Sequence, residues 1–182
     1  FKILSFVKMI GSRSFYGCSK LNEIKFSNLV ETIGEYAFCG CTNLSNALFS
    51  QESNITEINE GVFSDCQLLK HFEFPSKVEK IGIGSFAGCS QLEKVTFMSA
   101  NFLISICSNA FMNCSLLSTI QIPSSVKEIG DNAFKGCQSI KVFVIPSSVV
   151  RIGSNAFNGC SNLENISIPS SVTSIGKKAF AE

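Results

Sequence analysis

An internal repeat runs through all 182 residues of this chain and leaves few folds open to it. Phenylalanine recurs at intervals of 23 or 25 residues, at Phe15, Phe38, Phe63, Phe86, Phe111, Phe134, Phe157 and Phe180. An isoleucine stands five residues before each, at Ile10, Ile33, Ile58, Ile81, Ile106, Ile129, Ile152 and Ile175. A cysteine stands three residues after each of the first seven, at Cys18, Cys41, Cys66, Cys89, Cys114, Cys137 and Cys160. Because these columns coincide in every interval, the chain is predicted to contain about eight copies of one 23–25-residue unit.

Each unit is predicted to hold two short extended segments and a corner. Before the proline the pattern L-x-x-I-x-I-P alternates with period two, which indicates a strand with its isoleucines inward that ends at the proline. The V-x-x-I segment that follows is a second short extended piece. The glycine after its isoleucine, as at Gly130, is expected to take a positive φ at a tight corner. The A-F-x-x-C segment is interpreted as one helical turn, with Asn or Ser near its start as a cap.

One unit cannot bury its own apolar side, so stacking of units into a solenoid with a continuous core is expected. The two 25-residue intervals place their additional residues between Phe49 and Ile55 and between Phe97 and Leu103. Insertions confined to one point of the unit are predicted to be loops on one side of the stack.

The repeat frame IPSSVxxIGxxAFxGCxxLxxI resembles the BspA-like leucine-rich repeats of anaerobic bacteria and mucosal protozoan parasites. The resemblance covers residues 1–182. It implies a leucine-rich-repeat solenoid with parallel short strands on its concave face. Members of that family are commonly large surface proteins implicated in adhesion, and the family has no catalytic motif to carry over.

The chain is predicted to be a single repeat domain over residues 1–182 and a piece of a longer array. Phe1 and Ile3 fit a strand pair, and the chain ends after Phe180, before the next cysteine is due. Both ends therefore fall within a repeat. Apolar edges exposed at such ends favour end-to-end self-association.

Composition excludes several classes of protein. The 15 basic and 14 acidic residues give a net charge of +1, whereas a nucleic-acid-binding protein would show a basic excess. No apolar run reaches the ~18 residues of a membrane-spanning helix. We therefore expect neither nucleic-acid binding nor membrane insertion by this segment.

The seven in-frame cysteines have two interpretations. They could bind metal or form a disulfide ladder, or they could be small buried apolar residues with free thiols. One cysteine per unit lacks the paired spacing of zinc sites, and an odd number cannot pair regularly, so the second interpretation is preferred. Cys39 and Cys107 lie outside the column, and Cys39 is expected near the surface, where it should react first with a thiol reagent.

No catalytic constellation emerges from the sequence. His71 is the only histidine and is predicted to point outward, away from the buried cysteines that could serve as its nucleophile. The G-x-G at Gly82 to Gly84 misses the dinucleotide-binding spacing. We therefore expect a non-enzymatic protein without a cofactor or a metal site.

The residues beside the first inward position of each strand are predicted to form an outward, two-residue-wide strip that binds a protein. They are Glu23 and Lys25, Asn46 and Leu48, His71 and Glu73, Lys94 and Thr96, Thr119 and Gln121, Val142 and Val144, and Asn165 and Ser167. Val142 and Val144 interrupt a polar pattern. They either reflect the preference of β-branched residues for strands or form the apolar centre of a binding site with a polar rim.

Two functions remain open at this point. The first is a cell-surface or secreted adhesin segment that binds a host or matrix protein, or another copy of itself, through the strip. The alternative is an intracellular, cytoplasmic scaffold that assembles protein complexes and keeps its thiols reduced. Both use the same fold, so the fold cannot separate them.

Overall fold

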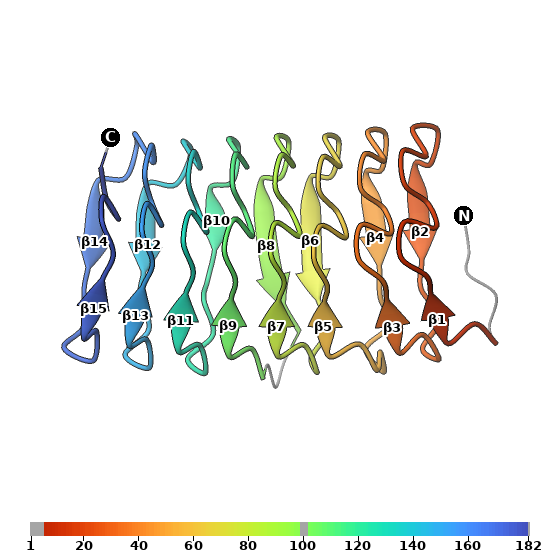
Figure 1. Ribbon diagram of the computed structural model, residues 1–182, viewed down its shortest axis with the longest axis horizontal. Helices are drawn as coiled ribbons and strands as arrows, with labels where there is room; N and C mark the ends of the chain where they lie inside the picture. Colours follow the sequence, from red (N-terminus) through yellow and green to blue (C-terminus); the bar gives the residue numbers. More distant parts are fainter. Residues whose placement is uncertain (1–5, 99–101, 182) are drawn as a thin grey trace.

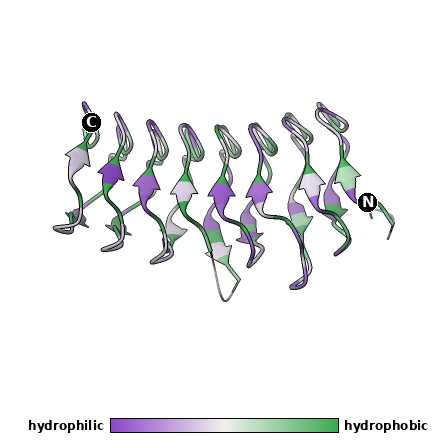
Figure 2. Ribbon diagram, turned by 60° about the horizontal axis from the view of Figure 1, so that its bottom comes forward, coloured by the Kyte–Doolittle hydropathy of each residue, from purple (hydrophilic) through white to green (hydrophobic). Residues whose placement is uncertain are grey.

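The computed structural model describes residues 6–98 and 102–181, and the chain winds through them as a solenoid of stacked coils (Figure 1). The predicted strand pair at Phe1 and Ile3 and part of the second insertion, residues 99–101, lie outside the described residues. The predicted solenoid of stacked repeat units is confirmed. The stack bows gently along its length (Figure 2). Over the described residues, no helix has the length and apolar character needed to cross a membrane.

Each coil contributes two short strands, one from each extended segment of the unit. The odd-numbered strands come from V-x-x-I: β1 (Met9–Ile10), β3 (Thr32–Ile33), β5 (Glu57–Ile58), β7 (Lys80–Ile81), β9 (Ser105–Ile106), β11 (Glu128–Ile129), β13 (Arg151–Ile152) and β15 (Ser174–Ile175). The even-numbered strands come from L-x-x-I-x-I: β2 (Glu23–Lys25), β4 (Asn46–Leu48), β6 (His71–Phe74), β8 (Lys94–Phe97), β10 (Thr119–Ile120), β12 (Val142–Val144) and β14 (Asn165–Ser167).

All strand pairs are parallel, and each strand pairs with its counterpart in the neighbouring coil. In the odd series, Ile129 of β11 lies opposite Ile106 of β9 and Ile152 of β13. In the even series, Phe143 lies opposite Ile166. The register therefore places each repeat position beside itself, so the sequence columns become columns in space.

The phenylalanine column forms the centre of the core, and its rings stack face to face from coil to coil. Consecutive ring centroids lie 5.0–5.7 Å apart, with interplanar angles of 7–25°. The isoleucines of the odd strands and the inward residues of the even strands pack around this column. Hydrophobic and hydrophilic residues alternate along each coil as a result (Figure 2).

The corner at A-F-x-x-C is not the predicted helical turn, because no helix forms anywhere in the described residues. Two left-handed residues per corner, such as Asn132 (φ 54°) and Gly136 (φ 75°), prevent helical continuation. Alternate amides of the corner donate to the next coil instead, as the Phe134 N–H does to the Ala156 carbonyl at 2.8 Å. The corners thus form a third hydrogen-bonded ladder, and the asparagine expected as a helix cap supplies a left-handed turn.

The glycine after the isoleucine has a different role from the one predicted, since none of these glycines has a positive φ. A Cβ at Gly82 would lie 2.5 Å from the Ile58 carbonyl oxygen, so glycine is needed for close backbone approach. Cys107 stands at the same position and still donates its N–H to the Ile81 carbonyl at 2.9 Å. Asn59 also stands at this position, and there the side-chain Nδ2 donates to the Ile33 carbonyl of the preceding coil at 2.7 Å.

Among the described residues, strand pairing is interrupted at two junctions between neighbouring coils. At the first junction both series are interrupted, and at the second only the even series is. The even strands form three groups, β2–β4, β6–β8–β10 and β12–β14, while in the odd series β1–β3 is separate from β5 to β15. Both interruptions of the even series precede a strand whose first inward residue is phenylalanine, Phe72 or Phe143. Each of these rings packs edge-on against the central column. The ring centroids of Phe72 and Phe86 lie 4.6 Å apart, and those of Phe143 and Phe157 lie 4.7 Å apart. We attribute the interruptions to the room that these larger rings require.

We predict that Phe111→Ala destabilises the stack by roughly 3–5 kcal/mol, because Phe111 is fully buried between Phe86 and Phe134 and its removal leaves a cavity. Urea unfolding followed by circular dichroism measures the change. Phe102→Ala is the matched control, since that ring is 57% exposed and should have little effect. Equal unfolding curves for Phe111→Ala and the unmodified chain would contradict the column.

Candidate protein-binding face

The outward strip lies where the sequence predicts it, on the solvent side of the even-numbered strands. In β6, exposed His71 and Glu73 alternate with buried Phe72 and Phe74. Glu23 and Thr96 are half-buried, and the other twelve residues of the strip are exposed: Lys25, Asn46, Leu48, His71, Glu73, Lys94, Thr119, Gln121, Val142, Val144, Asn165 and Ser167. The predicted strand register is therefore confirmed, whereas the binding role of the strip stays a prediction.

Parallel pairing brings members of the strip from neighbouring coils together. His71 lies opposite Lys94, which in turn lies opposite Thr119. Val142 and Val144 lie opposite Asn165 and Ser167. The strip is thus continuous within each group of strands and interrupted between β4 and β6 and between β10 and β12.

The two halves of the strip differ in charge. The first half carries five residues with ionisable side chains, of which Glu23 and Lys25 form an ion pair at 3.3 Å. From Thr119 to Ser167 the strip residues carry no charge. Within this second half, Val142 is 60% exposed and Val144 is 72% exposed. An uncharged apolar centre therefore follows a charged section along one face.

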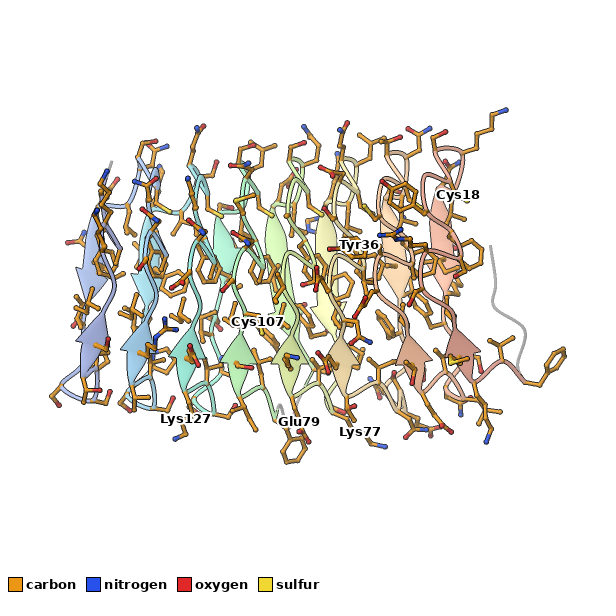
Figure 3. All side chains as sticks on the ribbon, viewed as in Figure 1. Cys18, Tyr36, Lys77, Glu79, Cys107 and Lys127 are labelled. Carbon is orange, nitrogen blue, oxygen red and sulfur yellow. The ribbon has the colours of Figure 1, made fainter. Side chains whose placement is uncertain are left out.

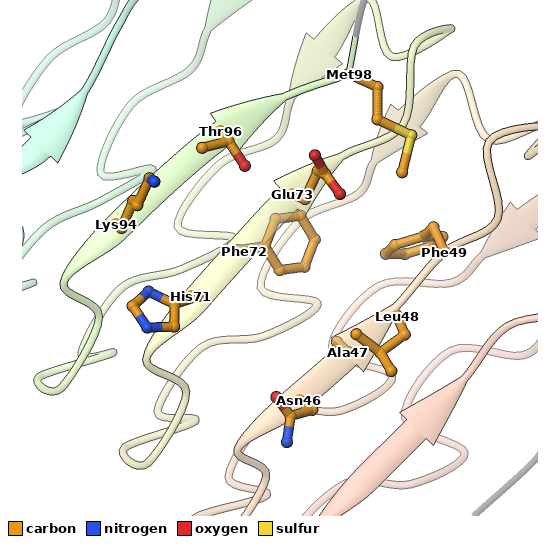
Figure 4. A pocket seen from close by; sticks show the side chains of 10 residues that line it. All are labelled: Asn46, Ala47, Leu48, Phe49, His71, Phe72, Glu73, Lys94, Thr96 and Met98. Atoms are coloured by element: carbon orange, nitrogen blue, oxygen red, sulfur yellow. The ribbon is translucent and has the colours of Figure 1, made fainter.

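Shallow hollows lie on this same face. One of about 370 Å³ lies over the interruption between β4 and β6 and is lined by Phe49, Glu73 and Met98, together with Leu48, His71 and Lys94 (Figure 4). Two others flank the valines, one toward β10 and one toward β14. In the sequence Phe49 marks only the start of the first insertion, and Met98 lies within the second. Their position directly after an even strand, where the chain lengthens, is the signal that could have marked them.

The cysteine column is buried from the second coil onward, with free thiols. Each Sγ–H donates to the carbonyl of the phenylalanine in the preceding coil, as Cys114 does to Phe86 at 3.1 Å and Cys137 to Phe111 at 3.1 Å. Burial raises the pKa of the Cys41 and Cys160 thiols to about 11. These contacts assign the column a packing role.

Two cysteines differ from expectation. Cys39 is buried with only 8% of its surface exposed, so the prediction that it lies near the surface is wrong. Its corner is covered by the next coil, which the spacing of the CGC triplet does not show. Burial raises its pKa. Cys18 is the exposed member of the column, in the first described corner (Figure 3).

The ten described residues that line the hollow beside His71 include neither cysteine nor serine. Over residues 6–98 and 102–181, no group of three or more His, Cys, Asp or Glu side chains is arranged to hold a metal ion. The geometry of this face suits contact with a macromolecule.

Comparison with known proteins places these observations in a family. The model of the BspA type leucine rich repeat region (6 copies) matches residues 1–105 and 99–182. A leucine-rich repeat protein from Eubacterium ventriosum has a similar structure, with a TM-score of 0.78 and 24% identity over 88% of this chain and 42% of that one. The chain therefore spans less than half of that protein. No curated protein matches significantly.

Two further solved structures share the fold. The T. pallidum leucine-rich repeat protein is 26% identical, with a TM-score of 0.65, over 96% of this chain and 72% of its own length. The pneumococcal vaccine antigen PcpA is 19% identical, with a TM-score of 0.67, over 97% of this chain and 67% of its own length.

Native alkylation with iodoacetamide is expected to label Cys18 first and half-buried Cys107 next, because these two thiols are more accessible than the others. Cys39 and the six buried column thiols should react only on unfolding. Peptide mass spectrometry identifies the order, and Cys18→Ser should remove the first label. Early labelling of Cys137 would contradict the buried column.

The stability of the stack should fall as the pH rises above about 8.5, the pKa of a thiol in the unfolded chain. The unfolded chain then loses protons that the folded chain retains, because burial raises the folded pKa of Cys41 and Cys160 to about 11. Each such thiol lowers the free energy of unfolding by roughly 1.4 kcal/mol per pH unit within this window. Urea midpoints between pH 7 and 10 measure the decline.

The matched control for this decline is the double variant Cys114→Ala and Cys137→Ala. Its free energy of unfolding should fall less steeply with pH, because two fewer thiols lose a proton on unfolding. Both thiols are fully buried, and burial raises their pKa well above the ordinary value. A midpoint that stays constant from pH 7 to 10 would show that the thiols ionise freely in the folded chain.

Proposed function

Because the chain belongs to the BspA-type leucine-rich-repeat family, we propose that it is a protein-interaction module that binds through the outward strip of the even-numbered strands. The observation that carries the proposal is that the described hollows open on this one face. The strip combines exposed apolar and charged side chains.

The centre of the proposed contact is the pair Val142 and Val144. The two valines form an apolar ridge between two hollows, with Thr119 and Gln121 on one side and Asn165 and Ser167 on the other. An apolar centre surrounded by uncharged polar groups can be desolvated at low cost, which is the usual arrangement at a protein interface. The outward strip of the preceding coils then supplies charged contacts at the edge.

The proposed setting is the cell surface or the secreted state, with the chain as a segment of an adhesin that binds a host or matrix protein. The support is the sequence resemblance to the BspA-like repeats. An intracellular scaffold is the second candidate, and a specific observation favours it: all nine cysteines are free, and Cys18 is exposed. Free thiols are typical of reducing compartments. Surface labelling of intact cells distinguishes the two.

We expect Val144→Arg to reduce binding to an immobilised basement-membrane extract at least tenfold, because a charge would be buried at the apolar centre of the contact. The fold should remain intact, since Val144 is 72% exposed. Val150→Arg is the matched control, because Val150 is also an exposed valine, at 44%, but lies beside β13 in the other series. Biolayer interferometry measures the binding.

Three results would count against this proposal. Unchanged binding of Val144→Arg would exclude the strip as the contact, and loss of the folded spectrum in that variant would show that the strand register is wrong. Absence of saturable binding by the unmodified protein would reject the matrix-adhesin role.

A further inference from the structure

We infer that the hollow over the interruption between β4 and β6 receives an arginine side chain of the bound protein, with Glu73 as its carboxylate partner. The inference rests on the proposed function and specifies part of its contact. Glu73, Phe49 and Met98 line both this hollow and an adjacent one that opens toward Gln51 and Ser76, so the two hollows share a wall.

The hollow exists because two neighbouring strands do not pair. Neither β3 with β5 nor β4 with β6 forms a ladder, so this junction between coils lacks strand hydrogen bonds on both faces. The inward residue of β4 is the small Ala47, whereas that of β6 is Phe72, and the rings of Phe49 and Phe72 meet edge-on at 5.9 Å. The junction is instead held by the corner ladder, where the Phe38 N–H donates to the Val62 carbonyl at 2.9 Å.

The carboxylate of Glu73 is available to a partner. It takes part in none of the ion pairs within 4.0 Å found among the described residues, although five other carboxylates do. Lys94, the nearest cation on the strip, lies toward the opposite end of the hollow with His71, while Glu73 projects toward Met98 (Figure 4). An exposed, unneutralised carboxylate beside apolar walls favours a cationic side chain.

The walls around Glu73 suit the rest of an arginine. Phe49 and Met98 are half-buried and offer a ring and a thioether against which an aliphatic stem or a planar guanidinium can stack. Phe49 is held in place by stacking on Phe26 at 4.3 Å. Gln51 and Ser76 add side-chain oxygens that can accept further N–H groups. Arginine presents five such donors in a planar fork, whereas lysine is a compact ammonium, so arginine is the better fit.

The test is an NMR titration of the 15N-labelled protein with N-acetyl-arginine amide at low ionic strength, with N-acetyl-citrulline amide as the uncharged analogue of nearly the same shape. We expect saturable shifts at Phe49, Glu73 and Met98 with the arginine probe and none with citrulline. N-acetyl-lysine amide should bind more weakly than arginine. Raised salt should weaken the arginine shifts, because the pair is partly exposed.

Glu73→Gln should weaken arginine binding roughly two- to fivefold, within the range of an exposed ion pair. Glu79→Gln is the matched control, because Glu79 is also an exposed glutamate but lies at the turn before β7, away from the strip (Figure 3). Equal binding of citrulline and arginine, unchanged binding in Glu73→Gln, or shifts confined to other residues would each overturn the inference.

The free-probe titration needs no protein partner, so its result is independent of the Val144→Arg experiment. The titration can fail while Val144→Arg reduces binding, and the probe can bind while Val144→Arg has no effect. The link to function is tested by binding of Glu73→Gln to the same basement-membrane extract. A reduction supports an arginine of the bound protein in this hollow. Adhesion equal to that of Glu79→Gln overturns the inference even if the free probe binds.

Discussion

Each coil of this solenoid is held on the next by phenylalanine rings that stack along one central column. Consecutive ring centroids lie 5.0–5.7 Å apart, which is compatible with the ~4.8 Å between paired strands, so one repeat distance serves every inter-coil contact. The corner ladder, the parallel strand pairs and the Sγ–H bonds from cysteine to the preceding phenylalanine carbonyl all repeat in step with it. A coil without neighbours would expose both faces of its ring and lose all of these bonds, which is why stability in such a protein belongs to neighbouring pairs of coils.

The same packing links the interior to the surface. Where Phe72 or Phe143 takes the place of a smaller inward residue, the ring fits against the central column but the strand no longer pairs with the one before it. The outer face is hollowed at both places, beside Glu73 in one case and beside Val142 and Val144 in the other. Irregular core residues thus add two distinct hollows to an otherwise uniform surface, one beside charged strip residues and one beside uncharged ones. A partner could therefore be recognised by position along the stack, although every coil has the same backbone plan.

Some functional features were predictable and others were not. The outward positions of His71, Glu73, Val142 and Val144 followed from period-two alternation, because a strand with one buried face has only one register that keeps its apolar residues inside. The hollow at Phe49, Glu73 and Met98 was not predictable. It depends on a missing strand pair, and the residues that line it come from three coils. The environment of Cys39 likewise depends on the coil that covers it.

Periodicity along the chain is sufficient to assign the solenoid, the composition of each column and the side of each strand that faces water, because these follow from short-range alternation and from the need to bury apolar surface. Local spacing misassigned the corner, where the A-F-x-x-C segment suggested a helical turn and Gly130 a positive φ. In this segment, hydrogen bonds within the corner compete with hydrogen bonds to the next coil. The outcome depends on how closely the coils approach. Gly82 and Gly130 allow close backbone approach, whereas the side chain of Asn59 makes a hydrogen bond of its own to the preceding coil. Contacts of this kind exist only once the coils are stacked, so the corner ladder, the interrupted junction and the hollow above it belong to the assembled fold.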